Sequence, residues 1–389
     1  MSTRPQRVLL AGGGHSHVEV LRRFALQPDP AIVLTLVSPD PATPYSGMLP
    51  GLIAGHYTHQ EAHIALAPLA RWAGARLVVD RVEALDTYTK TVTLGSGRHE
   101  AFDFISIDVG STPDVRIPGA LAHAVPVKPV AGFLAAWTHM QADAAAGSVR
   151  TIGIVGGGAA GVEVLLAMQW QLTRTLGAGA PRFALITDQP ALLPQHPPVV
   201  RARFGRLLVE RGVVLHLSSA AVAVEPASVH VTQGRRISLD RIVWATAAAA
   251  PSWPDVAGLA CDERGFIRID DHLRSPSHPF VFAAGDCAAQ DGQARPKSGV
   301  YAVRQGPPLA SNLRRAAKGM PLERYVPQRH ALALITTGDR HALASRGPFV
   351  AEGDWVWHWK DRIDRRFMAK YVAPAPPADR RATPISGHE

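Results

Sequence analysis

A strand, a glycine turn and a helix are predicted in direct succession at two places in the chain, and this repeat constrains the fold more than any other feature. In the first copy, the apolar residues 8–11 precede the glycines of 12–14, and apolar residues then return with helical spacing. In the second copy, the apolar run 151–155 precedes a complete Gly-x-Gly-x-x-Gly motif at 156–161. Such glycines let the backbone approach a diphosphate, which the following helix N-terminus attracts. The recurrence predicts two dinucleotide sites.

The first glycine loop departs from the full motif at its last position. Gly12, Gly13 and Gly14 are present, but His17 stands where a third glycine normally keeps helix and strand close together. The context of the loop, between a predicted strand and a predicted helix, still favours a dinucleotide site.

Two further positions in the first part of the chain match those that bind the cofactor in a dinucleotide fold. The apolar strand predicted at 32–37 ends in Ser38, where such folds place a residue for ribose hydroxyls, and Asp40 two residues later is an equal candidate. The strand predicted at 102–108 is followed by Gly110, which permits a close approach of a bound cofactor.

The second glycine loop predicts a nicotinamide site. Gly156, Gly158 and Gly161 supply the complete motif, and the strand at 183–187 ends at Asp188. A carboxylate at this strand end repels a 2′-phosphate and favours NADH over NADPH.

A third segment adds polar groups for a flavin. The strand predicted at 280–284 ends in Gly285 and Asp286, which suit a hydroxyl-rich ligand chain. Lys297 precedes a helix predicted from about residue 300 to 317, where a cation and a helix N-terminus stabilise negative charge on a flavin ring.

Bulk properties limit the setting in which the chain acts. Its 389 residues suffice for two or three domains, and the net charge of +9 suggests an anionic partner, although the arginines are scattered. Nothing resembles a nucleic-acid module. Cys261 and Cys287 give neither a disulfide framework nor a metal-ligand spacing, so no metal site is predicted. With no apolar leader and no membrane-length apolar run, we expect a cytoplasmic protein.

The C-terminal region combines tryptophan with basic residues. This composition is typical of a helix at a membrane surface, but also of a helix that packs on its own protein or on a second copy in a homodimer. Both interpretations stay open, and the proline-rich end is expected to be disordered. The residues concerned are Trp355, Trp357, Trp359, Ile363, Phe367 and Met368, with Lys360, Arg362, Arg365, Arg366 and Lys370.

Five stretches of the chain carry a resemblance to a known family. They are AGGGHSHVEV at 11–20, PYSGMLPGLIAGHY at 44–57, RPKSGVYAVRQG at 295–306, and the segments 332–347 and 355–371. Over roughly residues 5–372 the chain resembles the FAD/NAD(P)-binding pyridine nucleotide-disulfide oxidoreductases and their NADH dehydrogenase-like branch. Within that branch it is most similar to the module fused ahead of selenide, water dikinase.

The resemblance implies an α/β fold of two Rossmann-like dinucleotide-binding domains with a small C-terminal region. The implied division is an FAD-binding domain in two parts, 1–115 and 266–325, an inserted NAD(P)H-binding domain at 116–265, a C-terminal region at 326–372 and a disordered tail at 373–389.

The same resemblance implies roles for individual residues. FAD and NAD(P)H, with NADH preferred, are the implied cofactors, and Lys297 and Glu163 are the implied catalytic residues. Lys297 would face the pyrimidine edge of the flavin, and Glu163 would lie near the nicotinamide–flavin contact. The implied cofactor-binding residues are Gly12, Gly13, Gly14, His15, Ser38, Gly110, Gly156, Gly158, Gly161, Asp188, Gly285, Asp286 and Lys297.

The expected function is hydride transfer from NADH or NADPH to FAD, followed by electron transfer to a quinone or a small molecule, with a link to selenium metabolism. Two departures leave the acceptor open: Val300 and Arg304 replace glutamines of type II NADH dehydrogenases, and no Cys-x4-Cys pair follows the first domain's second strand. The alternatives are a non-catalytic flavin-binding sensor or partner protein, and a peripheral membrane NADH:quinone reductase on the cytoplasmic face.

Overall fold

The first half of the chain builds a parallel sheet around the first glycine loop. The computed structural model describes residues 4–293 and 295–374. Residues 8–11 of the central strand are all buried, as expected for a parallel strand covered on both faces. The sheet order is β21-β9-β1-β2-β5. Its strands are β1 (Gln6–Ala11), β2 (Ile32–Ser38), β5 (Arg76–Val79), β9 (Phe104–Ile107) and β21 (Val281–Ala283), and the helices α1 (His15–Leu26) and α10 (Gly299–Ala317) pack together beside it.

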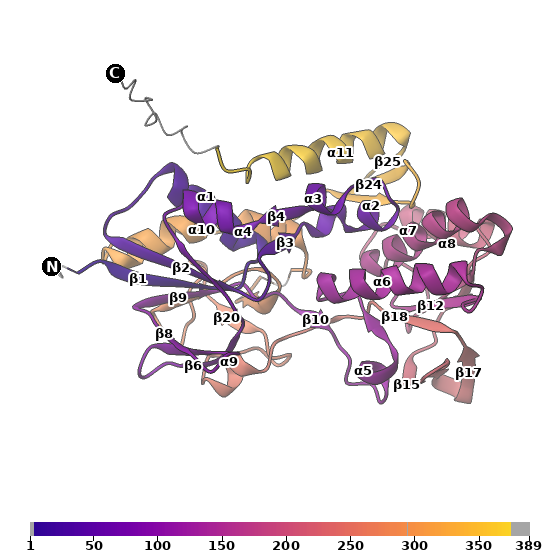
Figure 1. The fold of residues 1–389 in the computed structure, drawn as a ribbon, viewed down its shortest axis with the longest axis horizontal. Helices are drawn as coiled ribbons and strands as arrows, with labels where there is room; N and C mark the ends of the chain where they lie inside the picture. Colours follow the sequence, from indigo (N-terminus) through magenta and orange to yellow (C-terminus); the bar gives the residue numbers. More distant parts are fainter. Residues whose placement is uncertain (1–3, 294, 375–389) are drawn as a thin grey trace, which may run out of the picture.

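A second parallel sheet repeats this plan around the second glycine loop. Its order is β11-β18-β12-β13-β14, and β12 lies between β13 and β18 as β1 lies between β2 and β9. Figure 1 shows the two halves side by side. The elements are β11 (Val125–Pro126), α6 (Val130–Ala145), β12 (Thr151–Val155), α7 (Ala159–Leu176), η2 (Gly177–Gly179), β13 (Arg182–Ile186), α8 (Pro198–Glu210), β14 (Val214–His216) and β18 (Arg241–Trp244).

Each half also carries a three-stranded antiparallel sheet and short connecting elements. Two short strands, β10 (Thr112–Pro113) and β19 (Ala248–Ala249), pair where the chain passes between the halves. The antiparallel sheets are β6 (Val82–Asp86), β7 (Thr91–Leu94) and β8 (His99–Ala101), and β15 (Ala221–Glu225), β16 (Ser228–Val231) and β17 (Arg235–Ser238). The smaller elements are β3 (Ala42–Pro44), η1 (Ser46–Met48), α2 (Leu49–Ile53), α3 (His59–Ala62), β4 (His63–Ala65), α4 (Leu66–Trp72), α5 (Ala120–His123), η3 (Thr232–Gly234), α9 (Trp253–Val256), β20 (Ile267–Ile269), η4 (Gly285–Cys287) and β22 (Ala288–Gln290).

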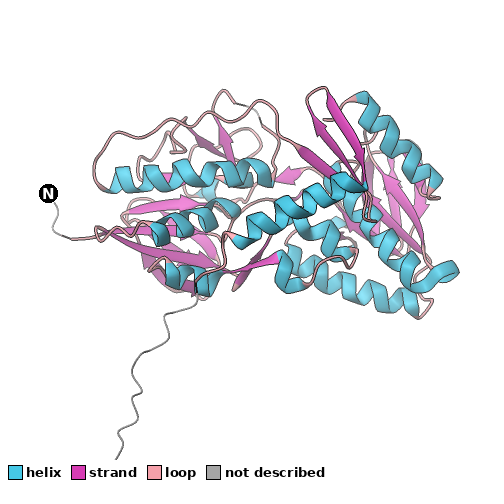
Figure 2. Cartoon of the chain, turned by 90° about the horizontal axis from the view of Figure 1, so that it is seen from above, coloured by secondary structure: helices cyan, strands magenta, loops and turns pink. Residues whose placement is uncertain are grey.

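The C-terminal region is a three-stranded sheet followed by one long helix that reaches both halves. Its elements are β23 (Ala333–Thr336), β24 (Ala342–Arg346), β25 (Phe349–Gly353) and α11 (Asp354–Ala369). Figure 1 shows α11 extending from the region of α3 to β25, and Figure 2 is viewed from the side on which α11 lies. Val356, Trp357 and Phe367 are buried, whereas Trp355, Trp359 and Ile363 are exposed.

The predicted fold class, two Rossmann-like domains with a small C-terminal region, is confirmed. Two local features have no counterpart in the sequence prediction. They are α5 and β11, between residues 114 and 130, and the C-terminal sheet. Most of the tail predicted to be disordered, residues 375–389, lies outside the described residues. Among the described residues, no helix combines the length and the apolar character that crossing a membrane requires.

Candidate functional site

The first glycine loop turns at the carboxyl end of β1 and leads into α1. Gly12 has a φ of +99°, and a Cβ there would lie 2.4 Å from the Asp108 carbonyl oxygen. A Cβ on Gly13 would meet the Ser38 hydroxyl oxygen at 2.8 Å. Gly14 is the N-cap of α1 and carries no capping side chain of its own, so the first N–H groups of the helix need an acceptor from elsewhere.

His17 takes the place of the third glycine through hydrogen bonds. Its ring is fully buried, and Nδ1 lies 2.6 Å from the Gly12 carbonyl oxygen while Nε2 lies 2.8 Å from the Ser106 hydroxyl. Because a carbonyl only accepts, Nδ1 donates and Nε2 accepts. Burial lowers the pKa of His17 to about 4. The imidazole therefore ties α1 to its turn where Gly161 does so by close packing in the second loop.

Asp108, directly after β9, is a buried acid that enters the first loop. Its Oδ2 accepts from the backbone N–H of Ser16 at 2.8 Å and of His17 at 3.3 Å. Burial raises the pKa of Asp108 to about 7, although the two N–H groups oppose the shift.

Asp286 and His15 lie beside an unpredicted partner, Lys128. Asp286 Oδ2 accepts from Lys128 Nζ at 2.8 Å. The Nε2 atom of His15 is buried with no hydrogen-bond partner among the described residues, and burial lowers the pKa of His15 to about 4. The ring of His15 packs on Tyr45 with 5.6 Å between centroids. Lys128 was missed because it lies in the proline-rich segment between the halves, where no local pattern marks a site.

Lys297 contacts the start of β22, directly after the Gly285–Cys287 turn. Its Nζ donates to the Ala288 carbonyl at 2.5 Å and lies 3.8 Å from the centre of the Phe266 ring. Burial lowers the pKa of Lys297. Lys297, Gly285 and Asp286 line a cavity of about 490 Å³. α10 begins two residues later, at Gly299.

In the second loop, glycine is present at each of the three motif positions for a different structural reason. Gly156 has a φ of +129°, and a Cβ there would lie 2.2 Å from the Ala245 carbonyl oxygen. A Cβ on Gly161 would lie 2.0 Å from the Gly156 carbonyl oxygen. A Cβ on Gly158 meets nothing within 4 Å, so this position borders open space at the N-terminus of α7. Asp188 accepts from Gln189 Nε2 at 3.1 Å and lies at the end of β13.

Glu163 faces the C-terminal region. It is half-buried on α7 and accepts from the backbone N–H of Thr336 at 2.8 Å and from its hydroxyl at 3.0 Å. Burial raises the pKa of Glu163, and the neighbouring Lys360 opposes this shift. Lys360 Nζ donates to Asp364 at 2.5 Å and to the Gly47 carbonyl at 2.5 Å. Burial likewise raises the pKa of Asp364.

The structure gathers most of the predicted cofactor residues and separates the two predicted catalytic ones. Glu163 and Lys297 share no hydrogen-bond partner among the described residues, because Glu163 is bound to β23 and Lys297 to the first residue of β22. Gly110 has a φ of +72° with open space around it, and Ser38 donates its hydroxyl to the Asp40 carbonyl. Sequence reasoning missed Lys128, Lys360 and Asp364, which contact the site only through tertiary packing.

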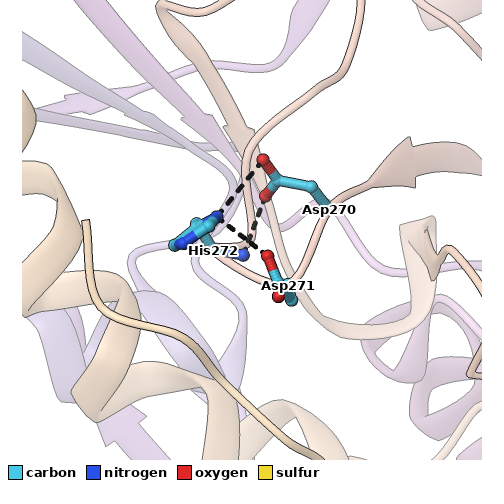
Figure 3. A group of neighbouring side chains, drawn as sticks. All are labelled: Asp270, Asp271 and His272. Atoms are coloured by element: carbon cyan, nitrogen blue, oxygen red, sulfur yellow. Dashed lines mark hydrogen bonds and ion pairs between the residues drawn. The ribbon is translucent and has the colours of Figure 1, made fainter. Parts of the chain in front are cut away.

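One group in the described part of the chain has the spacing of metal ligands, and the fold accounts for it. Figure 3 shows Asp270, Asp271 and His272. Asp270 accepts from the backbone N–H of His272 at 2.8 Å and of Arg274 at 3.0 Å, and His272 Nδ1 lies 2.9 Å from Asp271. These bonds belong to a turn, and we assign no metal to it.

Burial disfavours the thiolate form of both cysteines. Cys287 is fully buried, its thiol donates to the Ala284 carbonyl at 3.2 Å, and burial raises its pKa to about 12. Burial also raises the pKa of Cys261, to about 11. Neither thiol is prepared to act as a thiolate.

Two glycine loops at equivalent strand ends, each leading into a helix that starts at an N-cap glycine, define the class of two-dinucleotide oxidoreductases. The sequence profile of the family Pyridine nucleotide-disulphide oxidoreductase matches residues 6–306. The chain belongs to this family. The predicted family is thereby confirmed and, at the level of the family, so are the enzyme class and the pair of cofactors.

Known relatives support the same assignment. An NADH dehydrogenase-like protein of Mycobacterium tuberculosis is 27% identical over 224 residues, which cover 56% of each chain. The Type II NADH:quinone oxidoreductase of Haemophilus influenzae is 27% identical over 52% of this chain and 46% of its own. The chain thus spans about half the length of the curated relatives it matches. The sulfide:quinone oxidoreductase of Aquifex aeolicus has the same fold, with a TM-score of 0.78 at 18% identity over 95% of this chain and 93% of its own.

The residues present fit FAD at the first loop and a nicotinamide dinucleotide at the second. The open space at Gly158 is the clearest place for a bound dinucleotide, because a Cβ there would meet no protein atom within 4 Å. At the first loop, the unpartnered His15 Nε2 is a free polar group for the predicted FAD, whereas the space beside Gly14 and Gly285 is taken by the Asp108 carboxylate. Asp108 also accepts from two backbone N–H groups of α1.

Proposed function

We propose that the protein is an FAD-dependent oxidoreductase that takes hydride from NADH and passes electrons to a quinone. The observation that carries this proposal is the equivalence of the two glycine loops, each at the carboxyl end of a central parallel strand. FAD, when bound, accepts the hydride and releases electrons to the second substrate. The proposal assigns FAD to the domain formed by 1–115 and 266–325, and NADH to 116–265.

The protein contributes positioning and charge. Gly156, Gly158 and Gly161 would hold the nicotinamide dinucleotide, and Asp188 would select NADH by repelling a 2′-phosphate. Lys297 would stabilise negative charge near the first loop with the N-terminus of α10. Ser38, Gly110 and Asp286 would bind hydroxyl and carbonyl groups of FAD.

We place the site of the electron acceptor where α11 covers residues 44–47. Phe367 stacks on Tyr45 with 4.3 Å between ring centres, and Lys360 binds the Gly47 carbonyl. Reducing a quinone consumes two protons, and Glu163 and Asp364 are acids with raised pKa values in this region. The relative from Haemophilus influenzae, named for quinone reduction, supports this choice.

A small-molecule acceptor is the second candidate. The cavity at Lys297 is also lined by Arg264 and Arg268, which suit an anionic acceptor. A link to selenium metabolism remains a prediction of the sequence resemblance.

We further propose that α11 contacts a membrane surface. Trp355, Trp359 and Ile363 follow each other at four-residue intervals on its exposed side, and the exposed Arg362 and Arg366 flank them. A quinone acceptor would then be reached from the bilayer. The alternative is that the same face of α11 contacts a second copy of the chain in a homodimer.

The first test is an anaerobic titration of the purified protein with NADH and then with NADPH. We expect a flavin absorbance near ~450 nm that NADH bleaches at lower concentration than NADPH. A protein without flavin, or a flavin that neither nucleotide bleaches, would contradict the proposal. The rate at which a soluble ubiquinone oxidises the reduced protein is then compared with the rate for a small anionic oxidant. The faster oxidant identifies the class of acceptor.

A further inference from the structure

Asp108 occupies the space between two loops that the proposed function assigns to FAD. A Cβ on Gly14 would lie 2.3 Å from the carboxylate carbon of Asp108, and a Cβ on Gly285 would lie 2.3 Å from its Oδ1. Both glycines therefore leave room for this carboxylate. The acid is only 3% exposed and belongs to neither loop.

The carboxylate also uses donors that an anionic ligand needs. A helix N-terminus offers free N–H groups to an anion, and α1 begins at His15. Asp108 Oδ2 accepts from the N–H groups of the next two residues, Ser16 and His17. The equivalent helix α7, in the other half, starts at an N-cap glycine beside open space.

The charge of Asp108 decides whether a diphosphate can share this helix end. An ionised Asp108 adds a negative charge beside the two charges of the diphosphate, in a buried setting where like charges repel strongly. A protonated Asp108 keeps an oxygen lone pair for the N–H of Ser16 and gains an O–H that can donate to a phosphate oxygen.

We propose that Asp108 couples the binding of FAD at the first glycine loop to the uptake of one proton. The proton is taken from solvent and stays on Asp108, which donates it in a hydrogen bond to the diphosphate. The inference rests on the proposed function in one respect, the placement of FAD at this loop.

The other titratable groups around Asp108 support this assignment. They are His15 and His17 on α1, Asp286 and Cys287 on η4, Lys128 bound to Asp286, and Lys297 ahead of α10. The pKa values of the two histidines are lowered to about 4, and that of Cys287 is raised to about 12, so these three keep one protonation state around neutral pH. The pKa of Asp108 itself is raised to about 7.

The test is the affinity of the FAD-free protein for FAD, measured by quenching of flavin fluorescence from about pH 6 to about pH 8.5. The wild-type dissociation constant should rise about tenfold per pH unit above about pH 7, the slope for one proton. Calorimetry in buffers of different ionisation enthalpy should show about one proton taken up at pH 8. Asp108→Asn, which keeps the shape and cannot ionise, should bind FAD with little pH dependence.

Asp103→Asn is the matched control. Asp103 directly precedes β9, at the strand end opposite Asp108, and is bound to Arg7 and Arg4. This variant should keep the wild-type slope. An Asp108→Asn protein with the wild-type slope, or wild-type binding without proton uptake at pH 8, overturns the coupling alone. A wild-type protein that binds no FAD at any pH overturns the proposed function as well.

Discussion

The histidine at position 17 shows how one residue can replace another by a different physical means. In the second loop Gly161 allows the helix to touch the Gly156 carbonyl, because any side chain there would collide with it. In the first loop the carbonyl of Gly12 is held by the ring of His17 instead. An incomplete glycine motif therefore does not imply an incomplete turn, and spacing alone could not distinguish the two.

Asp108 should make the stability of the FAD-free protein depend on pH. Its folded pKa of about 7 exceeds the ordinary value of 3.8, so its favourable contribution is complete below about pH 4 and is lost as the pH rises to 7. The free energy of unfolding of Asp108→Asn relative to wild type should therefore increase by about 1.4 kcal/mol per pH unit in this range and level off above it. Urea unfolding at several pH values measures this, and a constant difference would refute it.

Lys297→Met should slow flavin reduction by NADH while FAD stays bound. The substitution removes the buried cation that lines the site, and losses of about tenfold or more follow from removing one such electrostatic group. Stopped-flow absorbance measures the reduction rate. The control is Lys90→Met, because Lys90 also lies over a phenylalanine ring, that of Phe280, and lines no part of the cavity. Equal rates for both variants would remove the role of Lys297.

At the scale of elements, the helix ends and strand ends were predictable and the tertiary partners were not. The strand–glycine–helix order placed β1, α1, β12 and α7 correctly because each carries a local pattern of apolar residues and glycine. The C-terminal sheet was missed because its short strands, such as β24, gain their stability from packing under α11 rather than from local pattern. The same reason hid the contacts of Lys128 with Asp286 and of Lys360 with Gly47, whose partners are more than 150 residues away in the sequence.

The N-terminus of α7 gives a test of the second loop. Gly158→Glu places a side chain into open space, so the fold should tolerate it, but it should abolish reduction by NADH because the carboxylate would meet the dinucleotide diphosphate. Gly205→Glu is the control, since Gly205 on α8 also borders open space. We expect both variants to retain FAD and only Gly205→Glu to be reduced. Normal reduction of Gly158→Glu would contradict the assignment of the loop.

The exposed face of α11 can be tested without removing the helix. Replacing Trp355, Trp359 and Ile363 with serine keeps the buried residues in place. The triple variant should no longer float with liposomes containing anionic lipid, whereas wild type should. Wild type that stays at the bottom of the gradient and sediments as a dimer would instead favour the homodimer.

At the scale of the whole molecule, the C-terminal region joins the two halves. Its sheet binds the second half, through Glu163 to Thr336 and Arg203 to Glu352. Its helix binds the first half, through Lys360 to Gly47 and Arg365 to Glu61. Tyr371, just after the helix, donates to Glu19 of α1.

Lys360→Met should weaken this connection. It leaves Asp364 buried without its partner, which typically costs about 3–5 kcal/mol when the acid is ionised. The loss should be smaller at acidic pH, where Asp364 is neutral. Lys370→Met at the exposed end of the same helix region is the control and should change the melting temperature little. Equal melting temperatures at neutral pH would refute a stabilising role for Lys360.

The position of α11 has a mechanical consequence. The paired strands β10 and β19 connect the halves at the chain crossings, and α11 connects them again through residues far along the sequence. A body held at two separate places resists hinge opening, so we expect the proposed nicotinamide cofactor and electron acceptor to enter and leave by fixed openings rather than by a swing of one half against the other. Heating should accordingly release both halves together, in a single cooperative transition.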